Sequence, residues 1–193
     1  LNAVNGDMHH ELSRIARDAD DDPEVKVLVI TGAGRAFCAG GDFGPGSETT
    51  HKITLEEARM IVDHLLEAHI PIISAVNGYA MGLGATVALL CDVVVAGRSA
   101  VFADTHVKMG IGAGDGGQLI WPLLIGVNKA KYFLMSGERV TAEEAERIGL
   151  ASFLVDDDAL LDKALSIAGA LCAGQFAHAH MRLARGEAAI HTK

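Results

Sequence analysis

The sequence predicts an α/β protein whose C-terminal part is mainly helical. Short apolar runs typical of buried strands alternate with segments of helical spacing over the first 116 residues. From Gly117 onward, helical spacing predominates. Strand–helix alternation followed by helices is typical of an α/β core with a helical extension, and 193 residues suit one domain. We expect a core over residues 1–155 and a C-terminal helical segment, 156–193, of the same domain.

The first half of the chain is expected to contain three strands and three helices. Asp20 to Pro23 break the first helix, and Thr54-Leu-Glu-Glu57 is a capping box that opens the second. Asn77-Gly78 is a turn signal between the second strand and the third helix. In chain order, we predict a helix over 7–20, a strand over 25–31, a helix over 54–69, a strand over 72–76, a helix over 82–90 and a strand over 92–96.

The second half is expected to be helical, with one short strand near its middle. A second capping box, Thr141-Ala-Glu-Glu144, marks one helix start. We predict helices over 117–125, 127–135, 141–148 and 158–173, and a strand over 152–155.

Charge and hydropathy exclude two classes of partner. Asp and Glu outnumber Lys and Arg by 25 to 16, and no basic run exceeds two residues, so we expect no nucleic acid surface. The uncharged run over 70–91 raises the question of a membrane span, but Pro71, Asn77 and several glycines divide it into strand, turn and helix. We therefore expect no membrane partner. An anionic ligand would have to be held by backbone donors and a few Arg or Lys side chains.

Cysteine and histidine spacing argues against a metal site. Cys38, Cys91 and Cys172 lie among apolar or small residues, so we expect buried free thiols and a reducing compartment. Neither Cys-x-x-Cys nor His-Glu-x-x-His occurs, and no metal is expected. Two histidine pairs are expected to be solvated rather than ligating: His9/His10 and His178/His180.

Two predicted strands run directly into glycine-rich segments. The strand over 25–31 leads into residues 32–46, and the strand over 72–76 leads into a turn and a helix start. Free backbone N–H groups in both segments could point to one spot beyond the strand ends. Two such donors would make an oxyanion hole for an enolate or a tetrahedral intermediate. The alternative is that the glycines only permit tight turns and close packing.

Dinucleotide binding is a rival interpretation of the same glycines. The segment over 112–117 matches G-x-G-x-x-G but has no convincing strand before it. Thr31-Gly-Ala-Gly opens like a short-chain dehydrogenase loop, yet Ala36 and Cys38 occupy the later glycine places and no Tyr-x-x-x-Lys follows. The sequence disfavours a Rossmann fold.

Four stretches together resemble the crotonase (enoyl-CoA hydratase/isomerase) superfamily. They are VLVITGAGRAFCAGGDF, SAVNGYAMGLGATVALLCDVVVAG, ADTHVKMGIGAGDGGQLIWPLLIG and TAEEAERIGLASFLV. The resemblance implies a crotonase-like ββα spiral (the ClpP/crotonase fold), with an acyl-CoA thioester as substrate. Coenzyme A would be part of the substrate, with no tightly bound cofactor. It also implies a homotrimer or dimer of trimers, in the cytoplasm, or in an organelle matrix if a targeting peptide is missing.

The resemblance assigns the oxyanion donors to the N–H groups of Gly41 and Leu83. It also places a second group of residues around coenzyme A or the substrate: Arg35, Ala36, Phe37, Ala39, Asp42, Phe43, Tyr79 and Gly82.

The chain departs from the family at both catalytic glutamates. By the resemblance, Thr86 and His106 occupy the two places. Hydration needs a base to activate water and an acid to protonate carbon, and Thr86 is neither near neutral pH. We therefore expect an isomerase or another crotonase-type reaction in acyl-CoA metabolism, with hydrolysis, decarboxylation and retro-Claisen cleavage open. The alternative is a catalytically silent acyl-CoA-binding or scaffold subunit.

The remaining acid/base candidates are His106 and Asp115, with Asp104 as a weaker third. His106 is expected to titrate near neutrality and face the thioester, or else to be a structural histidine. Asp115 is either a catalytic carboxylate or the N-cap of a helix over 116–124. Thr86 either hydrogen-bonds the substrate or packs as a buried helix residue.

Overall fold

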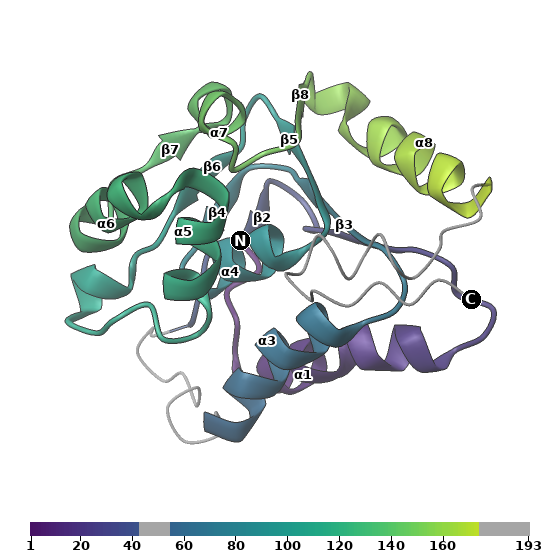
Figure 1. Ribbon diagram of the computed structural model, residues 1–193, viewed down its shortest axis with the longest axis horizontal. Helices are drawn as coiled ribbons and strands as arrows, with labels where there is room; N and C mark the ends of the chain where they lie inside the picture. Colours follow the sequence, from purple (N-terminus) through teal and green to yellow (C-terminus); the bar gives the residue numbers. More distant parts are fainter. Residues whose placement is uncertain (43–54, 174–193) are drawn as a thin grey trace.

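Strands occur in consecutive pairs, and each pair contributes one strand to each of two sheets (Figure 1). The computed structural model describes residues 1–42 and 55–173. The first sheet has the order β1-β3-β5-β8 and the second β2-β4-β6-β7; all neighbours are parallel except β6 and β7. A helix follows each of the first three pairs, and this ββα repetition is the spiral that the resemblance implied.

The strands of the two sheets are short. They are β1 (Leu28–Thr31), β3 (Ile72–Val76), β5 (Val93–Gly97) and β8 (Phe153–Val155), and β2 (Ala36–Cys38), β4 (Tyr79–Met81), β6 (Val101–Ala103) and β7 (Val140–Thr141).

The helices surround the sheets. They are α1 (Gly6–Asp21), α3 (Leu55–Glu67), α4 (Leu83–Leu90), α5 (Gly117–Ile125), α6 (Val127–Ser136), α7 (Ala142–Ile148) and α8 (Leu160–Ala173), with 3-10 turns η1 (His106–Met109) and η2 (Asp157–Ala159). Helices α1 and α3 lie side by side (Figure 1). On α8, Leu160 and Ala164 are buried in a cluster with Ile73 and Val95 of the first sheet.

The predicted elements are present, with small differences at their ends, but four strands were missed. These are β2, β4, β6 and β7, which have only two or three residues each. Such strands are too short for alternation to show in a sequence. The first strand was predicted over 25–31, but in the structure it begins three residues later, at Leu28.

Helix α4 lies at the centre of the molecule and all eight of its residues are buried. Its small residues allow this position. A Cβ at Gly84 would come within 2.5 Å of the carbonyl oxygen of Cys38, so only glycine lets α4 pack so closely on β2. This contact fixes the start of α4 beside the end of β2.

The fold bears on the expectations about a membrane span and about the three thiols. In residues 1–42 and 55–173, no helix is long and apolar enough to cross a membrane, and the uncharged run over 70–91 forms β3, β4 and α4. Cys38 and Cys91 are buried free thiols, as expected. The expectation was wrong for Cys172, which is exposed because it lies on the outer side of the last turn of α8.

Candidate functional site

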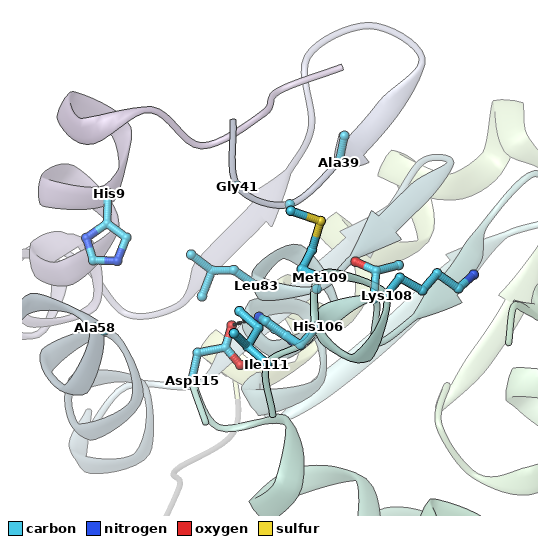
Figure 2. A pocket seen from close by; sticks show the side chains of 13 residues that line it. His9, Ala39, Gly41, Ala58, Leu83, His106, Lys108, Met109, Ile111 and Asp115 are labelled. Carbon is cyan, nitrogen blue, oxygen red and sulfur yellow. Dashed lines mark ion pairs between the residues drawn. The ribbon is translucent and has the colours of Figure 1, made fainter. Parts of the chain in front are cut away.

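A cavity of about 310 Å³ lies between helices α1 and α3, the ends of β2 and β4, and the segment after β6 (Figure 2). Strands β2 and β4 are parallel neighbours, so their carboxyl ends meet at one edge of the second sheet. The segments that follow both strands therefore reach the same space. They contribute Ala39, Gly40, Gly41, Gly82 and Leu83 to its wall.

Gly41 and Leu83 each follow a glycine with positive φ. The φ angles are +88° at Gly40 and +52° at Gly82. Leu83 is the first residue of α4, and the N–H groups of a first helical turn have no partner within the helix. Within residues 1–42 and 55–173, neither the Gly41 nor the Leu83 N–H donates a hydrogen bond. Two unpaired donors at one cavity are suited to hold an anionic oxygen.

The part of the wall that follows β6 carries a chain of side-chain contacts centred on His106. Its Nδ1 lies 2.7 Å from Asp104 Oδ1, and its Nε2 lies 3.0 Å from Asp115 Oδ2. The Asp104 side chain is 1% exposed, while those of His106 and Asp115 are 16% and 15% exposed toward the cavity. The imidazole therefore bridges one buried carboxylate and one that borders the cavity.

These two carboxylates keep His106 protonated. The hydrogen bond from its ring to Asp104 has the largest effect, followed by the one to Asp115. Together they raise the pKa of His106 to about 10, although burial by itself would lower it. The expectation that His106 titrates near neutrality was wrong, because the sequence did not reveal that two carboxylates face the ring. At neutral pH His106 is an imidazolium that donates from both nitrogens.

Asp115 is not the N-cap of α5. The cap position is Gly116, with φ +110° and no side-chain hydrogen bond. The Asp115 side chain instead turns inward, where its Oδ1 accepts a hydrogen bond of 3.3 Å from Thr86 Oγ1 and its Oδ2 meets His106. The helix-cap alternative for Asp115 is thus overturned by the backbone geometry of Gly116.

Thr86 is fully buried on α4 and lies behind Asp115 rather than on the cavity wall. Asp115 can approach it because Gly116 has no side chain: a Cβ there would come within 2.9 Å of Thr86 Cγ2. Thr86 contacts the carboxylate that borders the cavity, so its hydroxyl is suited to orient Asp115.

The residues predicted to surround coenzyme A or the substrate lie in several different places. Ala39 and Gly82 line the cavity. Ala36 and Phe37 belong to β2 and are 0% and 5% exposed, so their side chains pack in the core rather than on the cavity wall.

The other members of that group lie elsewhere. Arg35 is exposed ahead of β2, and Asp42 is half-buried at the end of the described segment. Tyr79 is 40% exposed, and the Arg139 guanidinium lies 5.7 Å from the centroid of its ring. Phe43 lies outside the described residues.

His9 borders the cavity from α1, a position that we did not predict from the sequence. It was expected to be solvated, but it is 2% exposed. The expectation was wrong because His9 shares one face of α1 with Ser13 and Ala16, four and seven residues later, and this face packs inward. The spacing of these three residues was the available signal. His10, on the next face, is exposed, as expected.

Asp104, His106 and Asp115 offer ligand atoms within 4.8 Å of one another. The two imidazole nitrogens point away from each other, however, and each meets a different carboxylate. One ion cannot sit between both pairs, so the arrangement suits two hydrogen bonds from an imidazolium better than a metal.

Comparison with known proteins gives a consistent result. The family model described as enoyl-CoA hydratase/isomerase matches residues 1–190. The chain is 39% identical over 168 residues to 2,3-dehydroadipyl-CoA hydratase of Escherichia coli (strain K12), which covers 86% of this chain and 66% of the relative. It is 35% identical over 176 residues to 1,2-epoxyphenylacetyl-CoA isomerase of the same organism, covering 87% and 67%.

Solved structures agree with the sequence comparison. The crystal structure of an enoyl-CoA hydratase/isomerase from Mycobacterium paratuberculosis matches with a TM-score of 0.84 and 37% identity, covering 95% of this chain and 74% of that one. The chain spans about 66% of the length of the curated relatives that it matches first. Because these relatives include a hydratase and an isomerase, they do not select one reaction.

Proposed function

Because the chain belongs to the enoyl-CoA hydratase/isomerase (crotonase) family, we propose that it binds an acyl-CoA thioester in the cavity and stabilises the enolate of that thioester. The N–H groups of Gly41 and Leu83 would hold the thioester oxygen. The observation that carries the proposal is that two unpaired backbone donors and the His106–Asp115 pair border one cavity. Coenzyme A enters as part of the substrate, and no other cofactor is needed for this chemistry.

Asp115 is the group that would move the proton. Its carboxylate takes a proton from a carbon activated by the thioester, the C–H electrons pass to the thioester oxygen, and an enolate forms between the two N–H donors. Asp115 exchanges this proton with solvent in the cavity and delivers a proton to a different carbon of the same chain, so the double bond shifts and the composition of the chain is unchanged. His106, as an imidazolium held from behind by Asp104, keeps Asp115 in place and ionised.

Isomerisation fits this site better than hydration because it needs a single proton-transfer group. Hydration needs a base for water and an acid for carbon. By the family resemblance, Thr86 replaces one glutamate, and its hydroxyl neither ionises near neutral pH nor borders the cavity. The other place holds His106, which is already engaged by two carboxylates.

The loss of an ionisable group at Thr86 also favours a second candidate, a catalytically silent acyl-CoA-binding subunit. This subunit would retain the donors of Gly41 and Leu83 but transfer no proton. The two functions therefore predict the same binding and different proton exchange.

Hydrogen exchange in D2O separates these candidates without knowledge of the acyl chain. We would first titrate the protein with acetoacetyl-CoA by calorimetry while following its enolate absorbance. We would then incubate 3-hexenoyl-CoA with the protein in D2O and measure deuterium uptake and double-bond position by mass spectrometry and NMR. Asp115→Asn is the test variant, and Asp18→Asn is the matched control because Asp18 is exposed on α1.

An active isomerase should enhance the enolate signal, incorporate deuterium and shift the double bond. Asp115→Asn should lower this exchange by about 100-fold or more, and Asp18→Asn should leave it unchanged. Binding without exchange in the wild-type protein would favour the silent subunit. Absence of acetoacetyl-CoA binding by folded protein at millimolar ligand would contradict both.

A homo-oligomer, as a trimer or dimer of trimers, is part of the proposal. Large apolar side chains are exposed along α5 and α6, among them Leu123, Val127 and Met135, which are 72%, 59% and 69% exposed. Such a surface on two adjacent helices is suited to contact another copy of the chain. Light scattering after size exclusion should give a mass of three or six chains, and Leu123→Glu with Met135→Glu should reduce it.

A further inference from the structure

A buried histidine on the α1 side of the cavity points to the kind of acyl chain that this protein accepts. We propose that His9 recognises a hydroxyl group on the acyl chain of the CoA thioester, so that hydroxylated chains are preferred to plain hydrocarbon chains. This inference rests on the proposed function of the cavity, and it adds the chemistry of the substrate. It assigns a role in binding to a residue from outside the His106–Asp115 pair.

His9 belongs to the cavity by position and is almost completely removed from solvent. It is 2% exposed, it borders the cavity from α1, and its ring lies on the far side of Leu83 from His106 (Figure 2). The Asp115 carboxylate is close enough to act electrostatically on the His9 ring. A ligand that reaches Leu83 and Asp115 therefore also comes near His9.

The His9 ring has hydrogen-bonding capacity that the described residues do not use. Neither ring nitrogen makes a hydrogen bond in that part of the chain: Nδ1 is buried at 3.7 Å from Oε2 of Glu57 on α3, and Nε2 has no partner there either. A polar group this deeply buried is normally paired. A bound molecule that offers a complementary group would satisfy the ring.

The neighbouring carboxylate selects the tautomer of His9. Burial lowers the pKa of His9, against the opposing attraction of Glu57, so the ring is neutral at neutral pH. A neutral imidazole carries one N–H, and the Glu57 carboxylate attracts it to Nδ1. The other nitrogen, Nε2, is then an acceptor, and its natural partner is a hydroxyl donor. A carboxylate on the chain would instead meet the like charges of Glu57 and Asp115.

The apolar side chains of the wall would not compensate for a missing partner. Ala58, Leu83 and Ile111 present apolar side chains to the same cavity. A plain hydrocarbon chain would displace water from Nε2 and leave it unpaired, whereas a hydroxylated chain would replace the lost hydrogen bond. The difference corresponds to about tenfold in affinity.

Calorimetric titration with matched saturated thioesters tests the inference without turnover. The ligands are hexanoyl-CoA, its 3-, 5- and 6-hydroxy derivatives, 5-oxohexanoyl-CoA and adipyl-CoA. The proteins are wild type, His9→Leu, His9→Gln and His10→Leu. His10 is a matched control because its Nδ1 also contacts Glu57, at 2.8 Å, while its side chain is 61% exposed and outside the cavity wall.

We expect at least one hydroxylated ligand to bind wild type about tenfold more tightly than hexanoyl-CoA. His9→Leu should lose this preference and bind hexanoyl-CoA at least as tightly as wild type, which also shows that the variant is folded. His9→Gln should regain part of the preference, and His10→Leu should keep all of it.

Three results would overturn the inference while leaving the proposed function intact. They are equal binding of all chains, a hydroxyl preference that persists in His9→Leu, and a stronger preference for the oxo or carboxylated chain. Failure of every ligand to bind folded wild-type protein, hexanoyl-CoA included, would contradict the proposed function itself.

Discussion

Raising the pH above 6.5 should remove a measurable part of the stability of this protein through one side chain, His106. The pKa of its imidazolium is raised to about 10 in the folded state by the hydrogen bonds to Asp104 and Asp115, against 6.5 for an unperturbed histidine. A group whose pKa is raised by folding stabilises the native state fully below the unfolded value. Its contribution is lost as the pH rises through the folded value.

The magnitude follows from proton linkage. Between pH 6.5 and about 8.5, native His106 keeps its proton and the unfolded histidine loses it, so full linkage gives about 2 kcal/mol of lost stability. The His106 side chain is 16% exposed, so solvent in the cavity screens its interaction with the two carboxylates. We therefore expect the loss of stability to be about 1–2 kcal/mol. Above about pH 8.5 the buried thiols of Cys38 and Cys91, whose pKa values are raised by burial, add a further loss.

Urea denaturation at several pH values in this range measures the effect. The single tryptophan, Trp121, is fully buried and gives a fluorescence signal for unfolding. The free energy of unfolding should fall with pH for wild type and for His10→Gln, in which the contacts of His106 remain. In His106→Gln this slope should be reduced. A wild-type stability that is constant or rises, or an equal slope in His106→Gln, would refute the assignment of a trapped imidazolium.

Three further predictions concern the neighbours of this pair. Gly116→Ala should destabilise the protein by about 1–3 kcal/mol in urea, because φ is +110° and the new Cβ would meet Thr86, whereas Gly112→Ala meets nothing and should change stability little. Thr86→Val removes the hydrogen bond to Asp115 and should lower kcat more than it changes KM for 3-hexenoyl-CoA; an unchanged kcat would show that the hydroxyl does not orient the carboxylate. Burial lowers the pKa of His9, so its contribution to stability is present above pH 6.5 and lost as the pH falls below it; His9→Phe should flatten this acid limb of the urea data, and a limb equally steep in the variant would contradict the effect.

The elements of the fold could be predicted where the local pattern is long enough to show a period. The amphipathic spacing of α1 and the two capping boxes located helices within a few residues. The strands β2, β4, β6 and β7 could not be found in this way, because two or three residues carry no alternation. Their place in a second sheet depends on pairing between segments far apart in the chain.

The sequence by itself determined the glycine-rich segments after two parallel strands, and through them the positions of Gly41 and Leu83. A backbone donor depends on local conformation, and the glycines at 40 and 82 specify that conformation with positive φ. The resemblance of the same segments to a known family also determined the spiral of ββα units.

Only the tertiary structure decided the electrostatics of the site. Whether a histidine is neutral or charged depends on which groups face it, and those groups come from other elements. His106 was a candidate from the sequence, but its charge follows from contacts with Asp104 on one side of the ring and Asp115 on the other. From the sequence we expected His9 to be solvated, but in the structure α1 packs against α3 and His9 is buried beside Glu57. Local sequence fixes conformation, whereas pKa and burial are set by neighbours that only folding brings together.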